Sequence, residues 1–141
     1  MAKLRHIAIS VPDPDRSALF YQDVFDMKIV GHTDSDLATG IYLSDGTICL
    51  ALLKYKTDEA AGEDRGRDYI GVHHMGFWCE SLEEQAAAIE SRGGTFHMDL
   101  PVDRGSLYFE RKYRDPDGVI FDISENGYED LRPESLKAEA G

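Results

Sequence analysis

Hydrophobic and polar positions repeat along this chain with a period of about 68 residues. Segments 4–25 and 72–94 each contain a histidine that opens a short apolar run, followed by a polar turn and an amphipathic stretch. Short apolar runs bounded by turns predict strands, and apolar residues at three- and four-residue spacing predict helices. Aligning His6 with His74 superimposes the predicted strand and helix of one segment on those of the other. The repeat therefore predicts two copies of one structural module.

Both predicted helices carry residues that favour their ends. Asp13 is suited to cap the first helix and Pro14 to occupy its first position, where a missing N–H costs nothing. In the second helix Ser81 and Glu84 have the spacing of a capping box, and two glycines follow residue 92. The apolar faces that we expect are Leu19, Phe20 and Val24, with Ala18 and Tyr21 alongside, in the first helix, and Leu82, Ala86 and Ile89 in the second.

Each module continues into a predicted β-hairpin. Residues 42–53 hold the pair Asp45-Gly46 between two strand-like runs, and residues 113–124 hold Asp117-Gly118 in the same place. Asp-Gly between apolar runs is a strong indication of a hairpin. Each module therefore has the predicted order strand, helix, strand, strand, strand (βαβββ).

One βαβββ module alone would leave a face of its sheet exposed, and a second module would cover it. We therefore predict an α+β fold in which two βαβββ modules form a half-barrel cup, within a single domain of residues 1–141. The first module spans 4–53, a polar linker 54–70, the second module 71–125, and a polar C-terminal tail 126–141. The alternative is an open α+β sandwich with a coincidental repeat. Closure within one chain and exchange across a dimer both fit the pattern.

Composition narrows the partners and the compartment. The chain has 15 basic and 27 acidic residues and a net charge of -12, which disfavours nucleic acid and anionic membrane surfaces. Cys49 and Cys79 both lie in apolar runs, which predicts small buried side chains and not a disulfide framework. Free buried cysteines suit a reducing cytosol. No apolar stretch has the length of a membrane span or the pattern of a signal peptide. We expect a cytoplasmic protein that binds neither nucleic acid nor membrane.

Three polar residues interrupt apolar strands and are the candidates for chemistry. His6 and His74 occupy equivalent positions in the repeat, and Asp122 lies among apolar residues in VIFDIS. A buried carboxylate is costly unless it is paired or bound to a metal. Two histidines and one carboxylate would hold a metal ion and leave open positions for a substrate. Taken singly, the histidines suit a strand edge and Asp122 suits a solvent-facing position.

The two adjacent histidines of GVHHMGFWCE have different predicted roles. Successive side chains of a strand point to opposite faces, so His73 and His74 cannot both face one cavity. By the repeat, His74 corresponds to His6 and His73 to Arg5. We therefore predict that His73 is an outer-surface residue.

Residues 4–125 resemble the vicinal oxygen chelate superfamily, which includes glyoxalases, epimerases, extradiol dioxygenases and the fosfomycin and bleomycin resistance proteins. The resemblance rests on HIAISVPDPDRSALFYQDVFDMKIV, HHMGF and RDPDGVIFDIS. It implies paired βαβββ modules around a metal, with ligands on the first, fourth, fifth and eighth strands. Those positions are His6, a residue near 50, His74 and Asp122 in this chain.

This chain departs from the family pattern at two places and from the extradiol dioxygenases at one more. The fourth-strand position is Leu50 when counted by the repeat and Ala51 by the usual family offset, and both are apolar. Asp122 stands where the family usually has glutamate. Lys112 stands where the extradiol dioxygenases usually carry a tyrosine, although those enzymes use the same three ligand positions kept here.

The resemblance implies a divalent-metal-dependent lyase, isomerase or dioxygenase that acts on a small oxygenated substrate through two of its oxygens. The cofactor expected is one ion of Fe, Zn, Ni, Mn or Co. The partners expected are a small-molecule substrate and a second copy of the chain in a homodimer. The alternative is a metal-independent small-molecule-binding or resistance protein of the same fold. Weaker candidates for the cavity rim or an anion clamp are His32, His97, Arg104 and Arg111, which are also suited to surface positions and ion pairs.

Overall fold

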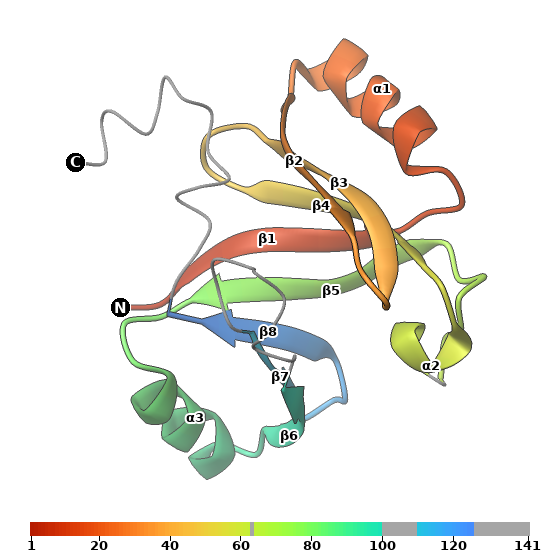
Figure 1. Cartoon of the computed structure of the whole chain (residues 1–141). Helices are drawn as coiled ribbons and strands as arrows, with labels where there is room; N and C mark the ends of the chain where they lie inside the picture. The colour runs from red at the N-terminus through yellow and green to blue at the C-terminus, as the bar shows by residue number, and fades with distance from the viewer. Residues whose placement is uncertain (63, 100–109, 126–141) are drawn as a thin grey trace. The chain divides into compact units, whose positions relative to one another are not determined.

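The computed structural model describes residues 1–62, 64–99 and 110–125 (Figure 1). These residues form two compact units. We call residues 7–73 the α1 unit, and residues 1–6 with the described part of 74–125 the α3 unit. The chain passes between the units inside two strands, β1 (Lys3–Ser10) and β5 (Gly71–Trp78). No helix of the described part is both long enough and apolar enough to span a membrane.

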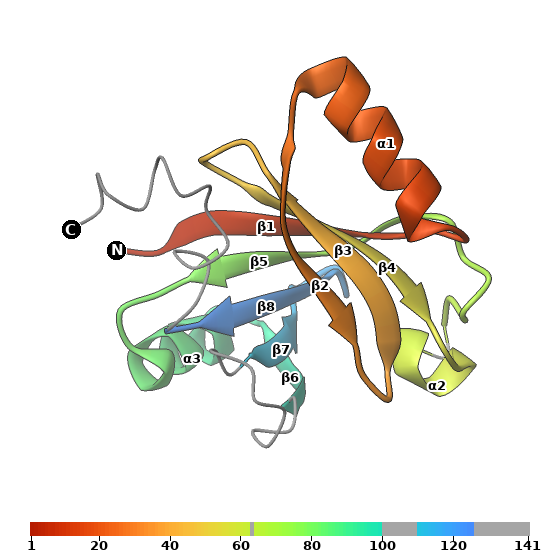
Figure 2. The same cartoon turned by 45° about the horizontal axis from the view of Figure 1, so that its top comes forward.

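In the α1 unit, helix α1 (Pro14–Phe25) is followed by strands β2 (Lys28–Asp34), β3 (Ala38–Ser44) and β4 (Cys49–Tyr55). The strands are ordered β2-β3-β4-β1, and α1 lies against β2, β3 and β4 (Figure 2). A short helix α2 (Asp58–Ala61) follows β4 in the segment expected to be a linker. Its Ala61 packs against Tyr55 and Ala38.

In the α3 unit, β5 is followed by helix α3 (Leu82–Ser91) and by strands β6 (Thr95–Asp99), β7 (Arg111–Arg114) and β8 (Ile120–Ser124). The strands are ordered β5-β8-β7-β6. β5 and β8 are parallel, with Gly76 opposite Asp122, whereas β7 and β8 are antiparallel, with Lys112 opposite Asp122. The α+β class and two βαβββ runs in chain order are therefore confirmed.

The predicted helix starts are confirmed. The Asp13 carboxylate accepts a hydrogen bond from the Arg16 N–H (3.2 Å), and Pro14 is the first residue of α1. The Ser81 hydroxyl accepts one from the Glu84 N–H (3.2 Å) at the start of α3. Each bond satisfies a donor that the first helical turn would otherwise leave unpaired.

The two hairpins share one turn chemistry. Asp45 Oδ1 accepts the N–H groups of Thr47 and Ile48, both at 2.8 Å. Asp115 Oδ1 accepts those of Asp117 (2.8 Å) and Val119 (3.0 Å). Each turn contains a glycine with a positive φ, 94° at Gly46 and 89° at Gly118, a conformation that favours glycine. The hairpin predictions are confirmed.

Each helix packs on its own core, but only one apolar face was predicted correctly. Ala86 is buried in α3, and Leu82 and Ile89 pack beside it, as expected. In α1 the core side is formed by Ala18 and Tyr21. The other predicted members of that face, Leu19, Phe20 and Val24, are more than half exposed. That part of the prediction is wrong, because the small Ala18 rather than the large neighbours lies against the sheet.

Candidate metal centre

His6, His74 and Asp122 come together within the α3 unit. They come from β1, β5 and β8, and each is at most 6% exposed. Because β5 and β8 are parallel neighbours with Gly76 opposite Asp122, residues of the same face lie side by side. The strand order of this unit therefore places the three predicted residues in one cluster.

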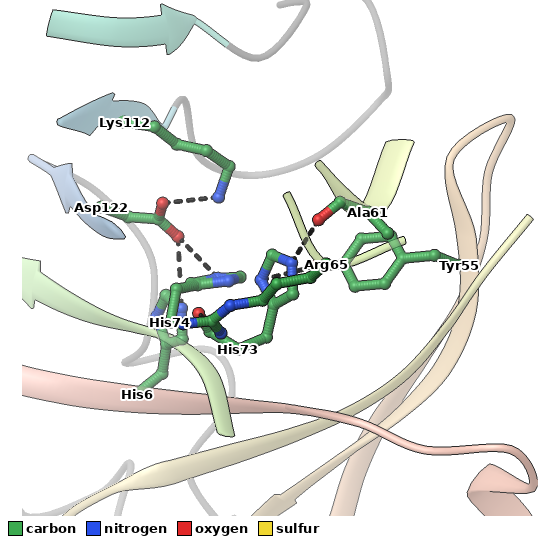
Figure 3. Close-up of polar contacts among 8 residues, drawn as sticks. All are labelled: His6, Tyr55, Ala61, Arg65, His73, His74, Lys112 and Asp122. Atoms are coloured by element: carbon green, nitrogen blue, oxygen red, sulfur yellow. Dashed lines mark hydrogen bonds and ion pairs between the residues drawn. The ribbon is translucent and has the colours of Figure 1, made fainter. Parts of the chain in front are cut away.

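One oxygen of Asp122 faces both imidazoles (Figure 3). Asp122 Oδ2 lies 3.3 Å from His6 Nε2 and 3.1 Å from His74 Nε2. The two rings meet edge to face with centroids 5.3 Å apart. One nitrogen or oxygen of each residue lies within 4.8 Å of those of the other two, close enough for a single ion to reach all three.

The second oxygen of Asp122 is held by a lysine. Lys112 Nζ donates a hydrogen bond to Asp122 Oδ1 at 2.5 Å, and the lysine side chain is 12% exposed. The two residues stand opposite each other on β7 and β8. The carboxylate therefore presents one oxygen to an ammonium group and the other to two imidazoles.

The protonation of the cluster suits a cation. Burial is the largest cause that lowers the pKa of His74, to about 3, so that its ring is neutral at ordinary pH. For Asp122, burial opposes ionisation, but His74 and the Lys112 ammonium hold the pKa well below its usual value. Among the described residues, Asp122 Oδ2 is a buried oxygen that accepts no hydrogen bond. A neutral His74 ring beside an ionised carboxylate oxygen that accepts no hydrogen bond fits a divalent metal ion.

Glu110 is a fifth titratable residue of this cluster, and the sequence did not point to it. Burial, followed by the charge of Asp122, raises the pKa of Glu110 to about 7. Glu110 directly precedes β7 and is two residues from Lys112, so both belong to the same face of the hairpin. The register of β7 on β8 could have identified Glu110, because it fixes which residues of ERKYR accompany Asp122.

The fourth-strand position carries no metal ligand. Leu50 packs with Ala18 in the core under α1. Ala51 is buried on the opposite face of β4, where it pairs with Tyr42 of β3. Neither side chain has an atom that could bind a metal ion.

His73 points away from His74 as predicted, but it is not a surface residue. It belongs to the α1 unit and is 6% exposed. Its Nε2 lies 2.5 Å from the Ala61 carbonyl oxygen, and its Nδ1 lies 3.4 Å from the Tyr55 hydroxyl (Figure 3). Arg65 Nη1 donates to the His73 carbonyl at 2.9 Å. The prediction was wrong because α2, absent from the predicted linker, covers this residue.

The weaker candidates do not join the cluster. His32 is exposed and His97 is half-buried on their strands. Arg111 pairs with Asp99 at 3.0 Å, as the ion-pair alternative predicted. Arg104 lies outside the described residues.

Comparisons with known proteins identify the family and the fold of the chain. The model of the Glyoxalase/Bleomycin resistance protein/Dioxygenase superfamily matches residues 3–123. A lactoylglutathione lyase of Haemophilus influenzae is 23% identical over 133 residues, which cover 88% of this chain and 93% of the relative. A methylmalonyl-CoA epimerase in complex with methylmalonyl-CoA has a TM-score of 0.70 at 24% identity, covering 88% of this chain and 94% of the other. The epimerase of Mycobacterium tuberculosis has a TM-score of 0.70 at 18% identity, covering 98% and 91%.

Proposed function

Because the chain belongs to the Glyoxalase/Bleomycin resistance protein/Dioxygenase superfamily, we propose that it is a metal-dependent enzyme of the lyase or isomerase kind. The observation that carries the proposal is the buried Asp122 Oδ2, which accepts no hydrogen bond among the described residues and faces two imidazole nitrogens. His6, His74 and Asp122 would hold one divalent ion. When bound, the ion supplies Lewis-acid polarisation of a substrate oxygen and stabilises negative charge that develops there.

The residues of the chain itself support proton transfer. Glu110 belongs to the cluster with a pKa of about 7, where a carboxyl group can both accept and release a proton at neutral pH. It would replace the fourth-strand carboxylate that Ala51 cannot provide. The neutral His74 and the ionised Asp122 would hold the ion without taking part in that transfer. The substrate proposed is a small molecule that presents two oxygens to the ion, with the proton to be moved beside one of them.

Metal content tests the ligand set. We expect protein purified without a chelating resin to hold about one divalent ion per chain, and His74→Ala to lose it. His32→Ala, which changes an exposed histidine of β2, is the matched control and should keep the ion. Equal metal content in His74→Ala and the wild type would refute the site.

Isotope exchange tests the reaction class. The enzyme is incubated in D₂O with methylmalonyl-CoA and, separately, with lactoylglutathione, and deuterium incorporation is followed by NMR. Metal-dependent incorporation into either compound supports proton transfer next to a carbonyl. Consumption of dioxygen with a catechol, in place of exchange, would instead support a dioxygenase.

A second candidate function, metal-independent binding of a small molecule, is favoured by one observation. The Lys112 ammonium already compensates the Asp122 charge at 2.5 Å, so the cluster does not depend on a metal for charge balance. Ligand binding that survives both EDTA and His6→Ala would support this candidate.

A further inference from the structure

The two oxygens of Asp122 have different surroundings, and Lys112 creates the difference. Oδ1 accepts a hydrogen bond from Lys112 Nζ, while Oδ2 faces the imidazoles of His6 and His74. A carboxylate can hold a metal ion through one oxygen or through both. Which mode Asp122 uses therefore depends on whether Oδ1 is free.

We propose that Lys112 is a positioning residue that keeps Oδ1 of Asp122 occupied, so that Asp122 offers a metal ion Oδ2 alone. This inference rests on the proposed metal site. With two imidazoles and one carboxylate oxygen as protein ligands, coordination positions stay open for the two substrate oxygens. If both Asp122 oxygens bound the ion, one of those positions would be filled by the protein.

A purely structural role does not account for Lys112. A buried ion pair commonly adds little net stability compared with apolar side chains of similar volume. The side chain of Lys112 is 12% exposed and directly opposite Asp122, the one carboxylate among the candidate ligands. A cation there also repels a divalent ion, so it weakens metal binding. The presence of a lysine that lowers metal affinity at a metal site is explained if the lysine keeps coordination positions of the ion open for the substrate.

Cobalt(II) titration of metal-free protein tests the role. Lys112→Met keeps the apolar stem but removes the charge and the donor, and Lys112→Arg keeps both. We expect Lys112→Met to bind Co²⁺ at least about tenfold more tightly, since repulsion is lost and a second oxygen is gained. The visible Co²⁺ absorption should weaken, as it does when the coordination number rises, and Lys112→Arg should match the wild type. Lys54→Met, at an exposed position of β4, is the control and should change neither property.

Each outcome bears on the inference. Tighter Co²⁺ binding by Lys112→Met cannot come from local damage, because damage weakens a metal site. Weaker or unchanged Co²⁺ binding by this variant, with an unchanged spectrum, would overturn the inference. If Lys112→Met does not fold, the neutral and shorter Lys112→Gln takes its place with the same expectation. If the wild type binds Co²⁺ and Lys112→Met binds it with the same affinity and spectrum, this inference is refuted and the proposed function is not. Failure of both proteins to bind any metal refutes the inference together with the proposed function.

Discussion

Gly76 and His6 occupy neighbouring space in the α3 unit, and the ring of His6 fills the position that a side chain on residue 76 would need. A Cβ built on Gly76 would overlap the His6 imidazole. Gly76 also stands opposite Asp122 on the parallel pair of β5 and β8. The absence of a side chain at residue 76 therefore lets the first-strand histidine reach the carboxylate of the eighth strand.

Replacing Gly76 should damage metal binding without removing any ligand. In Gly76→Ala the new methyl group must displace the His6 ring, whose Nε2 now lies 3.3 Å from Asp122 Oδ2. We expect metal affinity to fall by about 10- to 100-fold, the range seen when the groups that orient ligands are changed. Affinity is measured by competition with a chromophoric chelator.

Gly118→Ala separates this effect from a general loss of stability. Gly118 has a φ of 89° and an open surrounding, so alanine there strains the backbone without touching the cluster. The free energy of unfolding should fall by about 1–2 kcal/mol, while metal affinity stays unchanged. Equal loss of affinity in both variants would show that the Gly76 effect is not local.

Glu110 should be needed for proton transfer but not for metal retention. In Glu110→Gln the amide can neither accept nor return the proton, so we expect isotope exchange to fall by about 10²- to 10⁴-fold. Metal content should remain near that of the wild type. A variant that lost the ion and the activity together would make Glu110 a ligand instead.

The pH profile gives Glu110 a second readout. The base must be ionised, so the wild-type exchange rate should rise with pH up to the pKa of Glu110, about 7, and then level off. A bound cation lowers the pKa of a neighbouring carboxyl group, so the rising part of the pH profile, its acid limb, moves to lower pH. The residual activity of Glu110→Gln should lack the limb, whereas a merely structural role would leave it in place.

Local chemistry explains what the sequence could predict. The caps at Asp13 and Ser81 and the turns after residues 45 and 115 depend on side chains that bond to the backbone within a few residues. The cluster of His6, His74 and Asp122 was also predictable, because the repeat makes the first two equivalent and an aspartate among apolar residues needs a partner.

Residues whose role depends on contacts between distant segments were not predictable. Glu110 joins the cluster only through the register of β7 on β8. His73 is buried because Ala61 of α2 lies against it. Leu19 and Phe20 look like core residues in the apolar pattern, yet Ala18 is the residue that contacts the sheet.

His73 should stabilise the fold without serving the metal site, although it is adjacent to His74. His73→Phe keeps an aromatic ring but leaves the buried Ala61 carbonyl without the contact it now has at 2.5 Å. We expect the free energy of unfolding to fall by about 1–3 kcal/mol, measured by urea denaturation. Metal content should be unchanged, and His32→Phe, at an exposed position, should leave both unchanged. Loss of metal in His73→Phe at full stability would contradict this division between neighbouring histidines.

The neutral, buried His74 predicts a loss of stability in acid for the metal-free protein. Burial lowers the pKa of this histidine from 6.5 to about 3. Between those two values the unfolded chain binds a proton at residue 74 that the folded chain does not bind. Acid therefore favours unfolding, and stability should fall as pH decreases below 6.5, with His74 contributing up to about 1.4 kcal/mol per pH unit.

Urea denaturation at about pH 8 and about pH 5 measures this loss of stability. His74→Asn has no group to titrate at this position, so its stability should depend less steeply on pH than that of the wild type. Equal slopes would show that His74 is protonated as readily in the folded chain as in the unfolded one.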